Sequence, residues 1–239
     1  MSSQPNATAQ TEDFEFAVLN EAVNYRTALL QDFRQYLRGR VLEVGAGIGQ
    51  FSSDLHTLPD INRLLSLEPE PRFCAAFRAR RPQLELLQGT VKDLPPGTAW
   101  DAIVSINVLE HIEADELELE AYARLLKQAH GTLCLFVPAR PEIYAPIDRD
   151  FGHFRRYTKP ELKRKLELAG FEVVSIRYYN LAGYFAWWLN FRVLGKRKFD
   201  AGSVRFFDRV VFPTIRTSET EICAPPFGQS LIVVARARP

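Results

Sequence analysis

The chain has 239 residues, 46% of them hydrophobic, which is enough for one α/β domain with a complete core. Its 30 Lys and Arg residues nearly balance its 29 Asp and Glu residues, so a net charge of +1 provides no overall field for binding nucleic acid. The cysteines, Cys74, Cys134 and Cys223, are too scattered for a disulfide framework or a zinc-binding spacing.

Residues 1–13 are polar and lack the basic and apolar regions of a signal peptide. Nowhere does an apolar run approach the roughly 18 residues that a membrane span needs. We therefore expect a cytoplasmic protein that is soluble or at most peripheral to a membrane.

The first predicted element is a helix over residues 14–37, where apolar side chains recur every three to four positions. Short apolar strands follow, and most of them are separated by helical segments. The strands are predicted at residues 40–44, 64–68, 84–87, 101–106, 133–137, 171–179 and 230–235. The helices between them are predicted at residues 50–58, around 73–77, in the acidic segment after residue 112 and at 158–170.

Two of these helices have recognisable features. The helix after the fifth strand begins at a capping box formed by Thr158 and Glu161. The acidic helix carries apolar residues at helical spacing, and these are expected to face the core. They are Leu117, Ala121, Leu125 and Ala129.

Apolar strands that alternate with helices are typical of a parallel sheet covered on both faces. We therefore predict an α/β fold with a doubly wound, seven-stranded, mostly parallel sheet. Residues 1–37 are expected to form a tail and helix over the site, and residues 38–239 the main domain. The connection between the last two strands, 181–228, is far longer than an ordinary hairpin loop, so it is predicted to be a structured insertion.

The most informative motif follows the first strand, where Gly45, Gly47 and Gly49 precede a helix. Glycine allows positive φ angles and lets a ligand approach the backbone, although a tight structural turn is the alternative. A nicotinamide dinucleotide motif requires its third glycine at residue 50, where this chain has Gln50. Together with Glu43 before the loop, the pattern resembles the first motif of class I S-adenosylmethionine-dependent methyltransferases. The resemblance implies that the loop holds the amino-acid part of the cofactor and that Glu43 helps to hold its ammonium group.

Three later segments continue this resemblance in the same order. Glu68 ends the second strand, where a carboxylate can accept hydrogen bonds from both ribose hydroxyls, and a solvated strand-end charge is the alternative. Residues 89–95 resemble the adenine-contacting loop, although Thr90 replaces the usual Asp, and the Leu-Glu-His-Ile sequence at 109–112 is typical of small-molecule members. The resemblance implies S-adenosyl-L-methionine as the cofactor. The implied cofactor site consists of Tyr25, Glu43, Gly45, Ala46, Gly47, Gly49, Glu68, Pro69, Val91, Lys92, Asn107 and Val108.

Methyl transfer requires the protein to orient a nucleophile and exclude water, because the cofactor carries the activated carbon. His111 follows the fourth strand, at the sheet edge where α/β proteins bind ligands, and it either accepts a proton there or packs against the acidic helix. Family members place a run like His153, Arg155 and Tyr157 over the mouth of the site, and an ion-paired surface loop is the alternative. The predicted catalytic residues are therefore His111, His153 and Tyr157.

Two other features have open roles at this point. Tyr25 is expected either to close over the cofactor, as an N-terminal tyrosine does in related enzymes, or to belong to the core. The carboxylates at residues 113–120 are typical of a solvated helix face, and no metal site is predicted.

The insertion is rich in aromatic residues, among them Trp187 and Trp188, and the basic run 196–198 follows them. Such a patch fits a lid over an apolar acceptor, the interface of a homodimer or a peripheral membrane contact. The sequence does not separate these three interpretations.

The favoured function is methyl transfer to oxygen, nitrogen or carbon of a small or lipid-like acceptor. A nucleic-acid methyltransferase is disfavoured, because residues 107–109 lack an Asn/Asp-Pro-Pro-aromatic motif and no Pro-Cys nucleophile is present. No nucleic-acid partner is therefore expected, and Gln50 disfavours a nicotinamide oxidoreductase. A catalytically inactive binding protein with this fold is the alternative from another class, against which the intact glycine loop argues.

Overall fold

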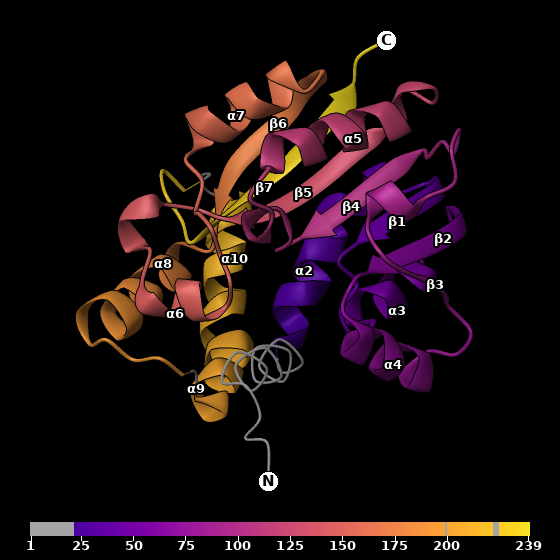
Figure 1. Cartoon of the computed structure of the whole chain (residues 1–239). Coiled ribbons are helices and arrows are strands. Elements are labelled where there is room, and N and C mark those ends of the chain that lie inside the picture. The colour runs from indigo at the N-terminus through magenta and orange to yellow at the C-terminus, as the bar shows by residue number, and fades with distance from the viewer. Residues whose placement is uncertain (1–21, 199, 222–224) are drawn as a thin grey trace, which may run out of the picture.

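The computed structural model describes residues 22–198, 200–221 and 225–239 of the chain (Figure 1). Residues 14–21 of the first predicted helix and Cys223 lie outside these ranges. The described part of that helix is α2 (Val23–Phe33), which the 3₁₀ turn η1 (Arg34–Tyr36) follows.

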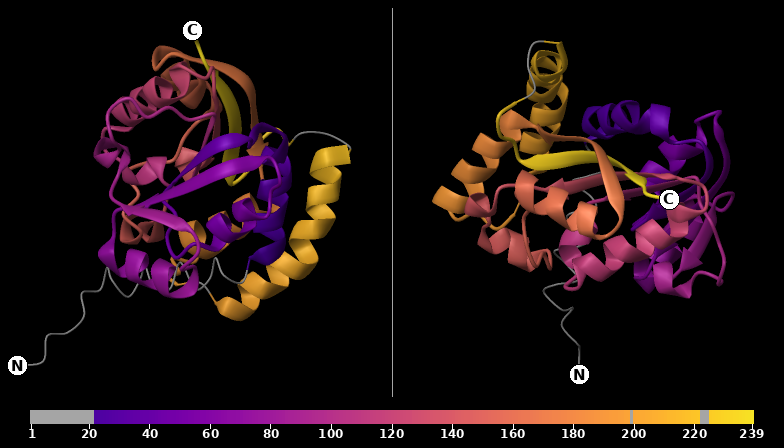
Figure 2. Two further views of the ribbon diagram at one scale, coloured as in Figure 1. Left: turned by 90° about the vertical axis from the view of Figure 1, so that its right-hand side faces the viewer. Right: turned by 90° about the horizontal axis from the view of Figure 1, so that it is seen from above.

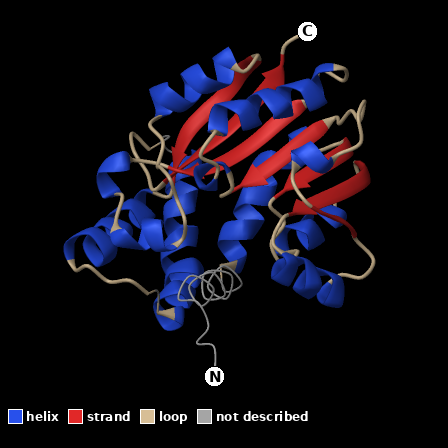
Figure 3. Ribbon diagram, viewed as in Figure 1, coloured by secondary structure: helices blue, strands red, loops and turns tan. Residues whose placement is uncertain are grey.

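Seven strands form one sheet in the order β3-β2-β1-β4-β5-β7-β6 (Figure 3). The pairs among the first five strands are parallel, whereas β7 runs antiparallel to both β5 and β6. The predicted α/β fold with a seven-stranded, mostly parallel sheet is therefore confirmed. The strands are β1 (Gly39–Val44), β2 (Ile61–Glu68), β3 (Glu85–Gln88), β4 (Ala102–Ile106), β5 (Thr132–Pro138), β6 (Phe171–Tyr179) and β7 (Ser230–Ala237).

Helices cover both faces of the sheet (Figure 2). Successive side chains of each strand point to opposite faces, so an apolar strand contributes to a buried cluster on each face. Leu42 of β1 belongs to a buried cluster with α5 (Asp115–Lys127) and α7 (Lys159–Leu168). Its neighbour Val41 belongs to a second cluster, with α2 and α3 (Gln50–His56). The other described helices before β6 are α4 (Pro71–Arg80), α6 (Pro146–Asp150) and the 3₁₀ turns η2 (Val91–Asp93), η3 (Leu109–His111) and η4 (Pro141–Ile143).

The buried face of α5 differs from the prediction. Leu117 is 62% exposed, and the fully buried apolar residues are Leu119, Tyr122 and Leu126. Asp115 also lies on the buried face, where an ion pair with α7 holds it. Ala121 and Leu125 are partly buried against the core as predicted, so the error lies at Leu117, and the paired Asp115 is buried at the start of the helix.

Two other local expectations have clear outcomes. The capping box at Thr158 is confirmed, since its hydroxyl accepts from the backbone N–H of Glu161 at 3.3 Å. β2 begins at Ile61, earlier than the predicted residue 64, and its first residues already pair with β1. Its early residues Asn62 and Arg63 are exposed, so hydrophobicity marks only the buried part of this strand.

The chain between β6 and β7 forms two helical segments at the carboxyl ends of the strands (Figure 1). The second of them passes beside α2 (Figure 2). None of the helices in the described residues combines the length and the apolar character needed to cross a bilayer. The segments are α8 (Leu181–Trp187) with the π-helix η5 (Trp188–Val193), then α9 (Ala201–Phe206), the π-helix η6 (Phe207–Val211) and α10 (Phe212–Glu221).

Candidate active site

A pocket of about 350 Å³ lies at the carboxyl ends of β1, β2 and β4. Parallel strands open such a crevice where the strand order reverses, here between β1 and β4. Gln50 and His111 also line it. Of the residues predicted to hold the cofactor, those in its lining are Tyr25, Glu43, Gly45, Ala46, Glu68, Pro69, Asn107 and Val108.

The glycine loop closes tightly over the end of β2. The backbone N–H groups of Gly45 and Ala46 both donate to the carbonyl of Leu67 at 2.9 Å. Gly45 has φ +76°, and a Cβ there would lie 2.3 Å from a methyl carbon of Val108. Only glycine fits this approach of the two strand ends.

Glu68 is buried, and main-chain groups hold its carboxylate in place. One oxygen accepts from the N–H of Gly47 at 2.8 Å and the other from the N–H of Glu70 at 2.9 Å. Each carboxylate oxygen has lone pairs for more than one donor, so both can still accept from a ligand hydroxyl. The structure therefore combines a loop-holding contact with an oriented acceptor that lines the pocket.

Glu43 lies deeper, at the end of β1. Its Oε2 accepts from the hydroxyls of Ser52 at 2.5 Å and Ser66 at 2.7 Å. Burial raises the pKa of Glu43 to about 7, and the two serine hydrogen bonds oppose this rise. A cation placed beside Glu43 would favour its charged form.

The other four predicted cofactor residues lie outside the pocket lining. Gly47 and Gly49 shape the loop. Gly49 (φ +83°) directly precedes α3 and lies so close to Phe77 that an added Cβ would clash with the ring of Phe77. Val91 is buried in the core, and the backbone N–H of Lys92 donates to the Thr90 hydroxyl at 3.3 Å.

A second cavity, of about 750 Å³, adjoins the first and lies under the helices between β6 and β7. Ala22, Tyr25, Asn107 and Phe151 line both. Asn107 has φ +52°, a left-handed conformation that Asn tolerates better than most residues and that occurs often at functional sites. The apolar side chains of the larger cavity include Phe136, Trp187, Phe191, Val204, Phe206, Phe207 and Val211.

Tyr25 contacts both the cavities and the core, and its closure over the cofactor stays a prediction. Its ring lines both cavities and also packs edge-on against Phe136 at 6.0 Å and Tyr179 at 5.4 Å between ring centres. It therefore forms part of the wall where the two cavities meet.

A buried polar network stands at the wall of the larger cavity. Asp148 Oδ1 accepts from Arg156 Nε at 2.8 Å and lies 3.1 Å from Nδ1 of His153. Burial would raise the pKa of Asp148, but these two partners outweigh it and lower that pKa. The Arg156 guanidinium lies 4.4 Å from the ring centre of Trp187, so the network reaches the insertion.

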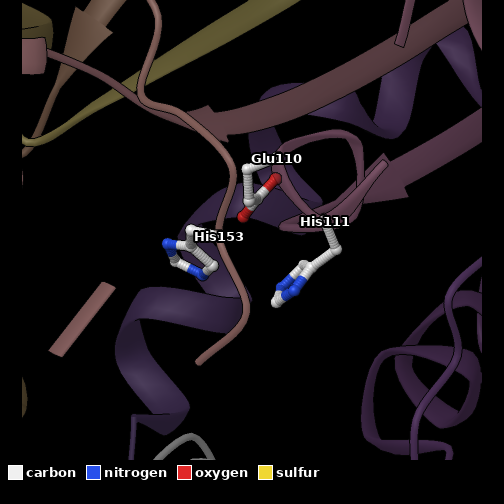
Figure 4. A group of neighbouring side chains, drawn as sticks. All are labelled: Glu110, His111 and His153. Atoms are coloured by element: carbon white, nitrogen blue, oxygen red, sulfur yellow. The ribbon is translucent and has the colours of Figure 1, made fainter. Parts of the chain in front are cut away.

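His153 and His111 meet edge to face across the junction of the cavities, 4.6 Å apart between ring centres (Figure 4). With Nδ1 held by Asp148, the buried Nε2 of His153 has no hydrogen-bond partner among the described residues. The His111 ring has an exposed side at the pocket, yet desolvation, with a smaller effect from His153, lowers its pKa to about 4. His111 is therefore uncharged at neutral pH.

Tyr157 lies elsewhere. It is fully buried, lines neither cavity, and places its hydroxyl 2.9 Å from Asp115 Oδ2. Arg155 also bonds Asp115, with 2.7 Å between Nη1 and Oδ1. Arg155 is thus ion-paired, as the alternative interpretation of this run expects, whereas Tyr157 is a buried hydrogen-bond donor, and we propose no catalytic role for it.

Comparison with known proteins identifies the relationship. A family model described as "Methyltransferase domain" matches residues 20–176. The chain belongs to this methyltransferase-domain family. The predicted family and its cofactor, S-adenosyl-L-methionine, are thereby confirmed at the level of the family.

Individual proteins that are similar to this methyltransferase-domain protein agree with the family assignment. A "probable S-adenosylmethionine-dependent methyltransferase" of Mycolicibacterium smegmatis is 31% identical over 137 residues, 56% of this chain, and the match spans about half (52%) of that protein's length. The DhpI structure in complex with SAH has a TM-score of 0.61 at 17% identity, over 98% of this chain and 94% of that chain. A SAM-dependent methyltransferase structure from Clostridium acetobutylicum has a TM-score of 0.60 at 8% identity, over 94% and 98%. These two structures show the shared fold.

Proposed function

We propose that the protein transfers a methyl group from S-adenosyl-L-methionine to a lipid-like acceptor bound under the inserted helices. One observation carries the proposal: the two cavities adjoin, and Tyr25, Asn107 and Phe151 line both. A donor in the smaller pocket would thus face an acceptor in the larger one with no water layer between them, as in-line transfer requires.

The smaller pocket provides matching groups for the donor. Glu43 offers a carboxylate for its ammonium group, the loop at Gly45 and Ala46 offers close main-chain approach, and Glu68 offers oriented oxygens for ribose hydroxyls. Contacts of Val91 and Lys92 with adenine stay a prediction. The intact set of groups favours an active enzyme over an inactive binding protein.

The larger cavity favours an apolar acceptor. Its walls are mainly aromatic and aliphatic, and its volume of about 750 Å³ exceeds that of the donor pocket. Lys196 and Lys198 line its exposed side, where they would attract an anionic group such as phosphate. We propose that His111 and His153 act on the acceptor atom, because they lie where the cavities meet.

The outer surface of the insertion suggests how such an acceptor is reached. Exposed apolar side chains occur there together with exposed Lys and Arg residues, a combination that suits an anionic membrane surface. We propose a peripheral membrane contact through this surface. The exposed apolar residues are Phe185, Trp188, Leu189, Val193, Leu194, Phe206 and Val210.

Two measurements test the proposed function. In calorimetry, S-adenosylhomocysteine should bind at micromolar concentration and NAD should not; binding of NAD alone would contradict the donor site. With methyl-labelled donor, label should enter the organic phase of a cell lipid extract. Label found only in a water-soluble metabolite pool would contradict the lipid-like acceptor.

The surface proposal needs its own test. The protein should sediment with vesicles that contain anionic lipid and stay in solution with purely zwitterionic vesicles. A concentration-dependent dimer that buries the same side chains, with no vesicle binding, would show instead that this surface is a homodimer interface.

A further inference from the structure

Two histidines and a glutamate converge at the junction of the two cavities (Figure 4). Glu110, His111 and His153 each place one ligand atom within 4.8 Å of the other two. We propose that these three side chains bind a divalent transition-metal ion, in contact with the acceptor cavity. This inference does not depend on the identity of the acceptor.

The main chain already holds the two contributing segments together. Glu110 and His111 are consecutive residues of η3, directly after β4, whereas His153 comes from the loop after α6. The backbone N–H of Phe154 donates to the carbonyl of Glu110 at 2.8 Å. The ligand atoms therefore need only small side-chain rotations to reach one ion, because the backbone between them is fixed.

His153 has the orientation expected of a metal ligand. Its ring is only 8% exposed, and the Asp148 carboxylate holds Nδ1, so Nε2 is the nitrogen that faces the other two side chains. Metal-binding histidines usually have the second ring nitrogen held in this way by a carboxylate. Asp148 is in turn fixed by Arg156 and by the backbone N–H of Ala145 at 2.8 Å.

The chemistry of the three ligands selects the kind of ion. Two neutral imidazoles and one carboxylate suit Zn²⁺, Co²⁺ or Fe²⁺, whereas Mg²⁺ and Ca²⁺ prefer oxygen ligands alone. Glu110 is fully buried, and its carboxylate provides the oxygen ligand of the three. Glu110 and His153 line the larger cavity, which leaves room for a further ligand from that cavity.

Three protein ligands with an open position are typical of catalytic rather than structural metal sites. An ion here would lie where the two cavities meet, and if the acceptor carries a hydroxyl group, the ion would bind its oxygen and lower the pKa of that hydroxyl. The sequence analysis predicted no metal site and a solvated helix face for the acidic residues after Ile112. Of these, Asp115 is instead buried and paired with Lys165 and Arg155.

Titration of the purified, chelator-treated full chain with Co²⁺ tests the site. We expect one ion per chain, with the visible absorption bands of Co²⁺ bound through nitrogen, displaced by Zn²⁺ and unaffected by excess Mg²⁺. His153→Gln and His111→Ala should abolish the bands, and Asp148→Asn should weaken Co²⁺ binding by about 10- to 100-fold, as loss of an orienting carboxylate does.

His130→Asn is the matched control, because His130 is an exposed histidine away from the cluster, and it should bind Co²⁺ as the wild type does. A native circular-dichroism spectrum and cooperative thermal unfolding show that each variant is folded. If His153→Gln does not fold, His111→Ala, at the exposed position, decides the test. The inference is overturned if the wild type shows no saturable Co²⁺ binding. It is overturned equally if both histidine variants keep the bands.

Discussion

The two cavities are built by different means. The donor pocket is formed by strand ends and a glycine loop, and main-chain N–H groups hold both its loop and the Glu68 carboxylate. The larger cavity is formed by side chains of helices inserted between β6 and β7. Substitutions in those helices can therefore alter the larger cavity, and with it the proposed acceptor, without altering a strand of the smaller pocket. The following predictions test this separation.

The largest effect is expected at the glycine loop. In Gly45→Ala, a Cβ 2.3 Å from Val108 and a strained φ should weaken S-adenosylhomocysteine binding by roughly 3 kcal/mol, about 100-fold. Gly97→Ala is the control, since Gly97 also has positive φ but has nothing within 4 Å of an added Cβ. Calorimetry should show normal affinity for this control; equal losses in both variants would mean that backbone strain, not the close approach, is responsible.

Glu43 should make stability depend on pH. Its pKa is about 7 in the folded protein against an ordinary value of 4.5, so its stabilising contribution is complete below about pH 4.5 and is lost as pH rises through 7. Glu43→Gln cannot ionise, so between pH 5 and pH 8 its free energy of unfolding should rise relative to that of the wild type, by roughly 3 kcal/mol at most. Urea unfolding of both proteins at pH 5 and pH 8 measures these free energies. If the difference between variant and wild type is the same at both pH values, Glu43 ionises normally.

Glu68→Ala should weaken S-adenosylhomocysteine binding by roughly 1–3 kcal/mol, because ribose hydroxyls and the Gly47 N–H lose a charged acceptor. Glu70→Ala removes a carboxylate that lies nearby but forms an exposed ion pair with Arg72, and it should change affinity little. If the dissociation constant is the same in both variants, Glu68 serves only to hold the loop.

The smallest effects are expected at the two tryptophans of the insertion, Trp187 and Trp188, which should differ from each other. Trp187 is 6% exposed and lines the larger cavity, whereas Trp188 is 45% exposed and does not. Trp187→Ala should lower turnover about tenfold, since a wall that positions the acceptor is lost, and leave donor affinity intact. Trp188→Ala should keep turnover on a soluble acceptor and reduce binding to anionic vesicles. A loss of donor affinity in either variant would show that the two halves are coupled.

Local pattern determined much of the donor half. Apolar strands, helical spacing and the glycines before α3 specified the sheet, its covering helices and the strand-end pocket, because each depends on residues close together in the chain. The capping box at Thr158 is of the same kind. Local pattern failed where burial depended on a distant partner, as for Asp115, which is buried in an ion pair with Lys165 of α7.

Only the tertiary structure decided the acceptor half. It separated His153, which faces the cavity, from Tyr157, which is buried against Asp115 in the same run. It also distinguished Trp187 from its neighbour and brought Glu110 and His111 to His153. No sequence period relates these positions, because their proximity follows from how the loop after α6 and the inserted helices pack on the strand ends. Residues close together in the sequence therefore predicted the strand-end pocket that we propose for the donor, whereas the larger cavity, proposed for the acceptor, depends on long-range packing.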